Sequence, residues 1–381
     1  MFLGKISLLN FKNHENLALN FNKKINCIIG NNGVGKTNLL DAIYYLCLTK
    51  SYFNQVDQQN ILFKKDFFRL EGSFKKQGES FELVYKLPAN KRKELIINET
   101  PLTKLSDHIG NFPAIIISPD DGQLITGSSE ERRRFIDNTI SQVNHEYLNQ
   151  LILYNKVLAQ RNAALKRFAE TRSVDRVLIE SYDQQIINAG IKIYEARKIA
   201  IQKLYPAFQS FYRQLSFERE AVGFTYQSQL NETPFDELLK KSFDRDLMLQ
   251  RTDVGIHKDD IEFFITPALK PQAEDSSSVL KSPLGDLAVG VKLKKFGSQG
   301  QQKSFIIAIK FAQYSFIKNP ERKPLVLIDD IFDKLDNDRS QKLVELLAGN
   351  DFGQVFITDT DDGHIREVLK GEEKLFEVFK V

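Results

Sequence analysis

The 381-residue sequence is short of three things: cysteine, net charge and long apolar runs. Its two cysteines, Cys27 and Cys47, cannot build a disulfide framework, so we expect buried thiols in a reducing, cytoplasmic setting. No run approaches the roughly 18 to 20 apolar residues that span a bilayer. The first residues also lack the plan of a signal peptide. These absences exclude a disulfide-stabilised secreted scaffold and a membrane-spanning chain, and they indicate a soluble protein.

The charges nearly balance, since 53 Lys and Arg face 50 Asp and Glu for a net charge of +3. A bulk polycation is therefore excluded, and any binding of nucleic acid needs local basic patches. Such patches occur at 91–93, 132–134 and 292–295. Arg132, Arg133 and Arg134 open a long helical stretch, where guanidinium groups can bind DNA phosphates. The alternative for these three arginines is an ordinary solvated helix face.

The order of apolar patterns predicts an α/β protein whose two chain ends build one domain. Short apolar runs at 25–29, 112–118, 325–328, 353–360 and 375–381 are typical of buried strands, and 36–48 has a helical pattern. Between them, 67–102 carries β-type runs separated by polar turns, which predict a small antiparallel subdomain.

The middle of the chain is predicted to be a helical insertion. Two charged stretches, 129–172 and 175–215, each favour a helix of about 40 residues without a sustained heptad. A Pro- and Ser-rich stretch at 266–285 predicts a surface loop. The predicted domains are residues 1–118, the helical insertion 119–250, and residues 251–381, which return to the α/β domain.

Residues 30–37 read GNNGVGKT and fit the phosphate-binding pattern G-x-x-x-x-G-K-[ST]. The glycines let backbone N–H groups turn toward phosphate oxygens, and the helix that follows adds its dipole. Lys36 is expected to reach the β- and γ-phosphates, and the Thr37 hydroxyl to bind Mg²⁺. The alternative is a chance glycine-rich turn, but a strand precedes the motif and a helix follows it. The predicted nucleotide-binding residues are Gly30, Asn31, Asn32, Gly33, Val34, Gly35, Lys36, Thr37 and Asn38.

The run LVLIDD at 325–330 is an apolar strand that ends in two carboxylates. Beside a phosphate-binding loop, Asp329 is expected to hold Mg²⁺ and Asp330 to orient or deprotonate the attacking water. Two solvated acids at a strand end are the alternative. Because an aspartate reaches less far than a glutamate, we expect Asp330 to support only slow hydrolysis.

The stretch FGSQGQQKSF at 296–305 has neutral donors and no carboxylate, and an apolar helix follows it. It resembles the signature motif of ABC-type ATPases, in which Ser298, Gly300 and Gln301 would bind the γ-phosphate held by another subunit. The alternative is a serine N-cap with a capping-box glutamine. The segment 333–336 is placed like the D-loop of these ATPases, and Thr358 or Thr360 like their switch histidine.

His257 lies in the run GIHKDD and has carboxylates nearby. A metal site is one interpretation of this cluster. A lone histidine in a turn is more often a structural hydrogen-bonding group, and that is the prediction we favour.

Over its whole length the chain resembles the RecF family of ABC/SMC-like ATPases. The similar segments are KISLLNFKNHENLALNF, GNNGVGKTNLLDAIYYL, ISPDDGQLITGSSEERRRFIDNTIS, TDVGIHKDDIEF, FGSQGQQKS and LIDDIFDKLD. The resemblance implies an ABC-type ATPase domain, binding of ATP and Mg²⁺, and a head-to-tail homodimer formed with ATP. It also implies that Lys12 and Asn13 approach the nucleotide.

The resemblance further implies a role in recombinational repair and replication restart. The ATP-bound dimer would bind double-stranded DNA near junctions with single strands and, with RecR and RecO, help to load RecA. Hydrolysis would be weak and DNA-dependent, and would serve as a switch that releases the dimer.

Three other functions compete with this one. An ATP-binding subunit of a transporter is disfavoured because about 260 residues separate Thr37 from Ser298. A full SMC protein would need long heptad arms, which the chain lacks. A kinase or GTPase leaves the SQGQQ segment before its apolar helix unexplained.

Overall fold

The computed structural model describes residues 1–217, 220–267, 291–332, 336–361, 363, 366 and 376–381. The chain folds into two compact units. We call Met1–Asp121, Gln214–Phe217 and Lys303–Val381 the sheet unit, and Gly122–Arg213 and Glu218–Gln302 the helical unit. Both chain ends therefore lie in one unit, while the division of the chain into three domains stays a prediction.

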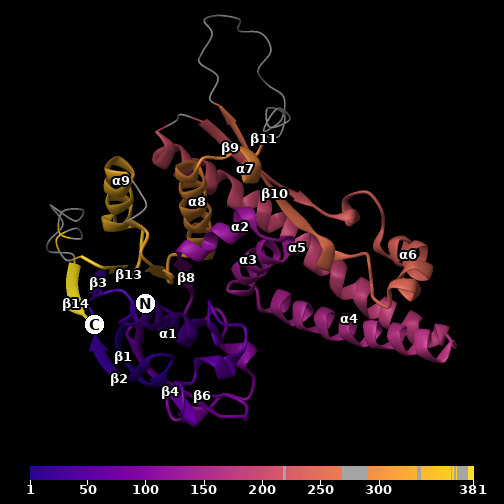
Figure 1. Ribbon diagram of the computed structural model, residues 1–381, viewed down its shortest axis with the longest axis horizontal. Helices are drawn as coiled ribbons and strands as arrows, with labels where there is room; N and C mark the ends of the chain where they lie inside the picture. Colours follow the sequence, from indigo (N-terminus) through magenta and orange to yellow (C-terminus); the bar gives the residue numbers. More distant parts are fainter. Residues whose placement is uncertain (218–219, 268–290, 333–335, 362, 364–365, 367–375) are drawn as a thin grey trace, which may run out of the picture. The chain divides into compact units, whose positions relative to one another are not determined.

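A five-stranded parallel sheet forms the centre of the sheet unit (Figure 1). Its order is β14 (Phe376–Lys380), β3 (Ile25–Ile29), β13 (Val355–Asp359), β12 (Leu325–Ile328) and β8 (Ala114–Ile117). The predicted apolar runs therefore all form strands. The four strands β3, β13, β12 and β8 are buried along their whole length, as expected for a parallel sheet covered on both faces.

A six-stranded antiparallel sheet forms the second layer of this unit. Its order is β2 (His14–Asn20), β1 (Phe2–Phe11), β4 (Phe67–Lys76), β5 (Glu79–Pro88), β6 (Glu94–Ile97) and β7 (Thr100–Pro101). The predicted antiparallel subdomain is confirmed, but β1 and β2 join it through the pairing of β1 with β4. That pairing links segments that are distant in the sequence, so no local pattern predicts it.

Helix α1 (Lys36–Leu48) contacts strands of both sheets and contributes to the core that they share. It is apolar on nearly all sides because both faces are covered. Figure 1 shows α8 (Gln299–Ile317) and α9 (Asn337–Ala348) on the opposite side of the parallel sheet from α1. The parallel sheet is thus covered on both faces. Short 3₁₀ turns at Asp57–Asn60, Leu105–His108 and Pro119–Gly122 complete the connections.

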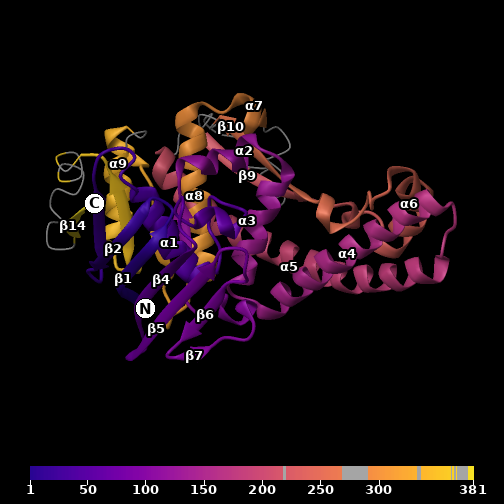
Figure 2. The same ribbon diagram turned by 60° about the horizontal axis from the view of Figure 1, so that its bottom comes forward.

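The helical unit contains α2 (Gln123–Thr126), α3 (Ser129–Ser141), α4 (His145–Thr171), most of α5 (Arg176–Ser216) and α6 (Phe235–Leu249). Figure 2 shows α4 and α5 side by side as a hairpin. The prediction of one helix over 129–172 is wrong, because the chain breaks between α3 and α4. Asn144 caps α4 by accepting a hydrogen bond from the Tyr147 N–H at 3.0 Å.

The helical unit also contains a three-stranded antiparallel sheet that was not predicted. Its order is β11 (Val291–Lys292), β10 (Asp260–Pro267) and β9 (Glu220–Gln227). The alternating burial of Ile261, Phe263 and Ile265 is the period-two signal of β10. The predicted loop at 266–285 is wrong for Thr266 and Pro267, which end β10, and its remainder lies outside the described residues. Two short elements, a 3₁₀ turn at Gln229–Asn231 and α7 (Leu293–Phe296), also belong to this unit.

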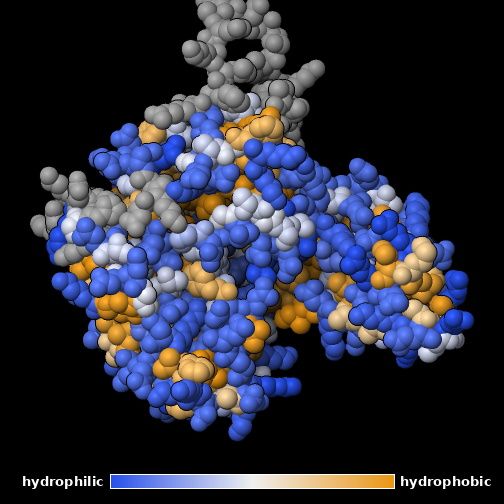
Figure 3. All heavy atoms as spheres, viewed as in Figure 1, coloured by the Kyte–Doolittle hydropathy of each residue, from blue (hydrophilic) through white to orange (hydrophobic). Residues whose placement is uncertain are grey.

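The end of the hairpin at which α4 is connected to α5 exposes apolar side chains (Figure 3). Met248 on α6 and Val177 on α5 are 78% and 77% exposed, beside a small core that includes Leu165 and Phe168. Among the described residues, no helix has the length and apolar character needed to cross a membrane.

Candidate nucleotide site

The loop of residues 30–35 leaves the end of β3 and leads directly into α1. Two of its glycines are required by geometry. Gly35 has φ = 111°, in the region that favours glycine, and stands at the N-cap of α1. At Gly30, a Cβ would lie 2.5 Å from the Val381 carbonyl oxygen. The loop is therefore shaped by contacts that only glycine permits, and it ends at a helix N-terminus, where anions bind well.

The Lys36 side chain folds back over this loop. Its ammonium donates to the carbonyl oxygens of Gly30 at 2.8 Å and Asn31 at 3.2 Å, and the residue is only 4% exposed. Within the described part of the chain, Lys36 forms no ion pair. A buried cation whose partners are neutral carbonyls keeps its charge available for an anion at the loop.

The acids at the end of β12 meet the start of α1. The Thr37 hydroxyl lies 2.9 Å from each carboxylate oxygen of Asp329. Thr358, at the end of β13, lies with its hydroxyl 2.9 Å from Asp329 Oδ1 and accepts from the Asp330 N–H at 2.9 Å. Parallel strands end at the same edge of a sheet, which is why residues so distant in sequence converge here.

Burial raises the pKa of Asp329, and its hydrogen bonds from Thr358 and Thr37 oppose that rise. Asp330 follows with φ = 42°, an unusual backbone angle for a residue with a side chain. Thr358, which the sequence suggested as a candidate switch residue, therefore contacts both predicted acids, Asp329 and Asp330. The structure assigns no such contact to Thr360.

The donor set of this site fits a magnesium nucleotide. Oxygen ligands suit Mg²⁺, and the hydroxyl of Thr37 and the carboxylate of Asp329 already face each other. The described residues contain no cluster of three or more His, Cys, Asp or Glu that could hold a metal alone. Mg²⁺ is usually bound by one or two protein oxygens together with water and nucleotide phosphates, and Thr37 and Asp329 are suited to supply the protein oxygens.

The turn between β1 and β2 lies against the loop. Asn13 Nδ2 donates to the carbonyls of Gly33 and Val34, and His14 Nε2 lies 3.0 Å from the carbonyl oxygen of Gly35. Lys12 instead pairs with the buried Asp41 of α1 at 2.6 Å. Lys12 and Asn13 were expected near the nucleotide, whereas His14 was not, because its place next to Asn13 is its only signal in the sequence.

Ser298 and Gln301 form a reciprocal pair at the start of α8. The Ser298 N–H donates to Gln301 Oε1 at 2.8 Å, and the Gln301 N–H donates to the Ser298 hydroxyl at 3.3 Å. This is the capping box that the sequence left open as the alternative. Ser298 is exposed, and Gly300 is partly so. The predicted D-loop residues 333–335 lie outside the described residues, and Asp336 caps α9.

Residues 2–381 match the family described as RecF/RecN/SMC N terminal domain. The DNA replication and repair protein RecF of Cytophaga hutchinsonii is 41% identical over 380 residues, covering 100% of this chain and 94% of that protein. The corresponding protein of Flavobacterium johnsoniae is 41% identical over 382 residues and is covered completely. The chain belongs to the RecF family.

Solved structures agree with this assignment. A structure described as "recombination mediator protein RecF-ATPrS in RecFOR pathway" is 25% identical, with a TM-score of 0.82 over 100% of this chain and 96% of that one. An Smc head domain from Pyrococcus furiosus, 16% identical with a TM-score of 0.53 over 96% of this chain and 91% of that one, supports the fold alone. The α/β class with parallel and antiparallel sheets and a helical region is confirmed.

The three arginines predicted to contact DNA already have protein partners in this RecF-family chain. Arg132 forms a two-pronged contact with Asp260, at 2.6 and 3.1 Å. Arg133 donates to the Asp259 carbonyl at 2.6 Å, and burial lowers its pKa. Arg134 lies near Glu130 and Glu131, and its side chain is 40% exposed, compared with 12% for Arg132. Their contact with DNA stays a prediction, for which Arg134 is the best placed.

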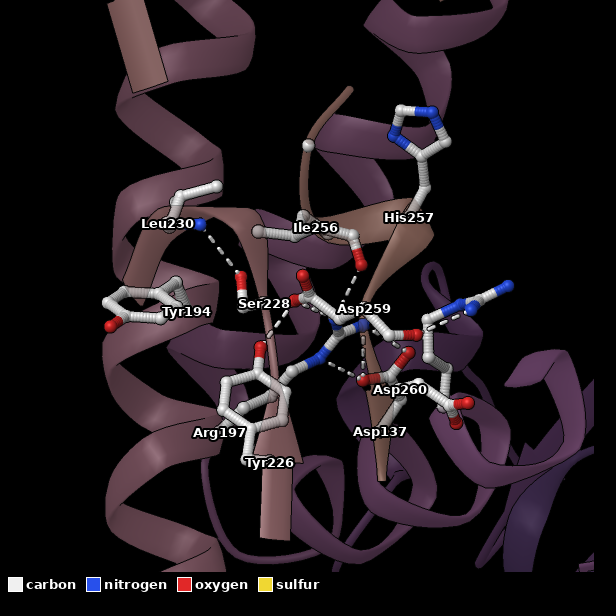
Figure 4. Close-up of polar contacts among 12 residues, drawn as sticks. Asp137, Tyr194, Arg197, Tyr226, Ser228, Leu230, Ile256, His257, Asp259 and Asp260 are labelled. Carbon is white, nitrogen blue, oxygen red and sulfur yellow. Dashed lines mark hydrogen bonds and ion pairs between the residues drawn. The ribbon is translucent and has the colours of Figure 1, made fainter. Parts of the chain in front are cut away.

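A buried polar network lies next to these arginines (Figure 4). Arg197 is 1% exposed and pairs with Asp137 at 2.9 Å and Asp259 at 3.1 Å. Burial would lower the pKa of Arg197, but Asp137 and the neighbouring acids more than offset it, so the pKa is raised. Tyr226 donates to Asp259 as well. The network ties α3, α5 and β9 to the residue just before β10.

His257 is a structural residue of the same unit. Its Nδ1 lies 2.8 Å from the Tyr154 hydroxyl and its Nε2 lies 3.1 Å from the Thr252 carbonyl oxygen. Burial lowers its pKa to about 4. Both ring nitrogens are thus engaged, which confirms the hydrogen-bonding interpretation.

Proposed function

We propose that this chain is an ATP-dependent DNA-binding protein of recombinational repair, in which ATP with Mg²⁺ drives head-to-tail pairing of two copies. The observation that carries the proposal is the convergence of Lys36, Thr37 and Asp329 at one sheet edge. Membership in the RecF family and the similarity to a RecF structure described with a bound nucleotide support it.

In this proposal each site residue has a distinct task. Lys36 exchanges its carbonyl partners for phosphate oxygens, which is favourable because a charged acceptor binds the ammonium more strongly. Thr37 and Asp329 hold Mg²⁺, whose charge when bound offsets that of the phosphates. Asp330, with its backbone held by Thr358, orients the attacking water. Its short carboxylate limits the rate, so hydrolysis is weak and serves as a switch.

Pairing is proposed to use the exposed start of α8. Ser298, Gly300 and Gln301 supply neutral donors and a helix N-terminus to a phosphate on the loop of the second copy. In the capping box the Ser298 hydroxyl accepts from the Gln301 N–H, which leaves its own proton able to donate to the phosphate. A dimer that forms only with ATP follows from this, because these donors need the phosphate on the loop of the second copy as their acceptor.

The paired form is proposed to bind double-stranded DNA near junctions with single strands, with Arg134 among the contacts. RecR, RecO and, through them, RecA are the proposed protein partners, because the similar solved structure is described as part of the RecFOR pathway. A cytoplasmic location follows from these partners.

The test is the mass of the protein in solution without nucleotide, with ATP, and with ATP plus gapped DNA. We expect ATP-dependent dimers of the parent chain but none of Lys36→Ala or Ser298→Arg, and DNA binding that follows the dimer. Ser173→Arg is the matched control, since Ser173 is also exposed in the helical unit. Normal ATP-dependent dimers of Ser298→Arg, or tight DNA binding by an ATP-independent monomer, would contradict the proposal.

A further inference from the structure

Three consecutive carbonyl groups of the phosphate-binding loop are held by two consecutive side chains. Asn13 Nδ2 lies 3.3 Å from the Gly33 oxygen and 3.0 Å from the Val34 oxygen, and His14 Nε2 lies 3.0 Å from the Gly35 oxygen. Asn13 lies in the turn between β1 and β2, and His14 is the first residue of β2. The Gly35 oxygen also accepts from the Leu39 N–H of α1 at 2.9 Å, so Asn13 and His14 act together with the helix in setting the direction of these successive peptide groups.

That direction matters because a trans peptide points its C=O and the next N–H in opposite directions. Holding the Val34 and Gly35 carbonyls toward the turn directs the N–H groups of Gly35 and Lys36 away from it. Successive backbone N–H groups that point into a concave loop are what bind phosphate in such sites. We propose that Asn13 and His14 are positioning residues that preset the loop amides for phosphate, an inference that rests on the proposed nucleotide binding.

The loop needs such support because its sequence is flexible. Gly33 and Gly35 both have positive φ angles, 86° and 111°, and glycine loses the most conformational freedom when it is ordered. A Cβ at Gly35 would lie 2.5 Å from His14 Nε2 and 2.6 Å from Asn13 Oδ1. The turn and the loop are thus in direct contact. Asn13 and His14 leave no room for a side chain at Gly35, and their hydrogen bonds offset the flexibility that glycine brings.

The hydrogen-bonding roles of both side chains can be assigned. A carbonyl oxygen only accepts, so His14 Nε2 must carry a proton toward Gly35. Asn38, in the first turn of α1, donates to Asn13 Oδ1 at 2.7 Å, which turns Asn13 Nδ2 toward the loop carbonyls. The loop, the turn and the start of α1 therefore form a closed set of hydrogen bonds.

The experiment compares His14→Phe, which keeps a ring but removes the donor, with His14→Gln, which restores a donor. Dissociation constants for ATP and ADP with Mg²⁺ are measured by calorimetry. We expect His14→Phe to weaken both nucleotides about tenfold, as for loss of one buried hydrogen bond. We expect His14→Gln to recover most of the affinity. Equal losses for ATP and ADP indicate that the loop amides have been disturbed, whereas direct contact with the last phosphate would affect ATP alone.

His108→Phe is the matched control. His108 is also buried in the sheet unit, and its Nε2 lies 2.8 Å from the Leu46 carbonyl oxygen, away from the loop. We expect this variant to lower the unfolding temperature and to leave both dissociation constants unchanged. If His108→Phe lost as much nucleotide affinity as His14→Phe, general destabilisation would explain both losses, and the inference would be overturned.

Asn13→Ser provides a second test if His14→Phe does not fold, because Asn13 is exposed and its replacement costs little stability. We expect a loss of up to about tenfold for ATP and ADP alike. ATP binding that survives both Asn13→Ser and His14→Phe, while Lys36→Ala abolishes it, would overturn the inference and leave the proposed function standing. A parent chain that binds no ATP would overturn both.

Discussion

The two units of the chain use buried charge in different ways. In the helical unit, Arg197 pairs with Asp137 and Asp259, and Arg161 pairs with Asp183 and Asp246 at 2.6 Å each. In the sheet unit, Lys36 is similarly buried but contacts carbonyl oxygens, and Asp329 contacts hydroxyl groups. Paired charges of the first kind also occur in the sheet unit, as in Lys310 with Asp121 and Lys12 with Asp41 at 2.6 Å each, whereas Lys36 forms none among the described residues.

The difference separates a structural role from a binding role. A buried ion pair is costly to break, because removing one partner leaves an uncompensated charge. A charge whose partners are neutral can exchange them for a ligand of opposite charge at little cost. The contrast explains why an arginine-rich segment such as 132–134 can be mainly structural, while a single lysine at a helix start is the centre of the proposed site.

The largest effect is expected when a paired charge of the helical unit is removed. Arg197→Met leaves Asp137 and Asp259 buried without their cation, so we expect unfolding of this unit to require about 3 to 5 kcal/mol less. Lys192→Met is the control, because its pair with Glu146 is exposed and contributes at most about 1 kcal/mol. Denaturant unfolding measures both free energies of unfolding. If Arg197→Met and Lys192→Met lost the same amount, buried and exposed ion pairs would not differ as we expect.

The next effect concerns the lysine of the sheet unit. Lys36→Met keeps the apolar stem and removes the charge, so we expect only a small change in stability without nucleotide. ATP affinity should fall by about 100-fold, or roughly 2.7 kcal/mol, because charge-assisted contacts to phosphate are lost. Calorimetry and the shift of the unfolding temperature by ATP measure this. A large loss of stability with unchanged affinity would reverse the roles assigned to the two units.

Lowering the pH tests the stability of each unit separately, because each contains a buried histidine. Burial lowers the pKa of His108 in the sheet unit and of His257 in the helical unit to about 4 in each case. The unfolded chain takes up these protons near pH 6.5, so the stability is complete above that pH and is lost as the pH falls toward 4. Each histidine should contribute roughly 2.5 kcal/mol to this loss by pH 4.5.

Denaturant unfolding at pH 7 and pH 4.5 measures that loss. His108→Phe should reduce the acid sensitivity of the sheet unit, and His257→Phe that of the helical unit. If either substitution changed both units to the same extent, the units would not unfold independently and the comparison would have to be abandoned.

The smallest effect is expected at Arg134. Because its contacts with Glu130 and Glu131 are exposed, Arg134→Gln should change the stability of the helical unit by less than about 0.5 kcal/mol. If Arg134 contacts a DNA phosphate, the variant should lower the salt dependence of DNA binding by about one phosphate contact. Arg132→Gln, by contrast, should destabilise the unit through Asp260. An unchanged salt dependence for Arg134→Gln would exclude this arginine from the DNA contact.

Much of the sheet unit could be predicted because its signals are local. A buried strand, a glycine-rich loop and the helix after it are contiguous, as are the apolar run of β12 and the acids at its end. The helical unit was harder to predict. The break at Asn144 depends on a single cap, and β9 and β10 pair segments separated by α6. Arg132 was predicted to contact DNA, because its actual partner, Asp260, lies 128 residues away and no local pattern reveals that pair.

The sequence by itself determined the kinds of groups at the proposed site: a lysine and a threonine at a helix start, and acids at a strand end. Tertiary structure decided which of them meet and what else joins them. Thr358 reaches Asp329 because β13 and β12 are neighbouring parallel strands. His14 reaches Gly35 because the turn after β1 lies against the loop. The physical reason is that motifs record chemistry along the chain, whereas the partner of a buried polar group is chosen by packing.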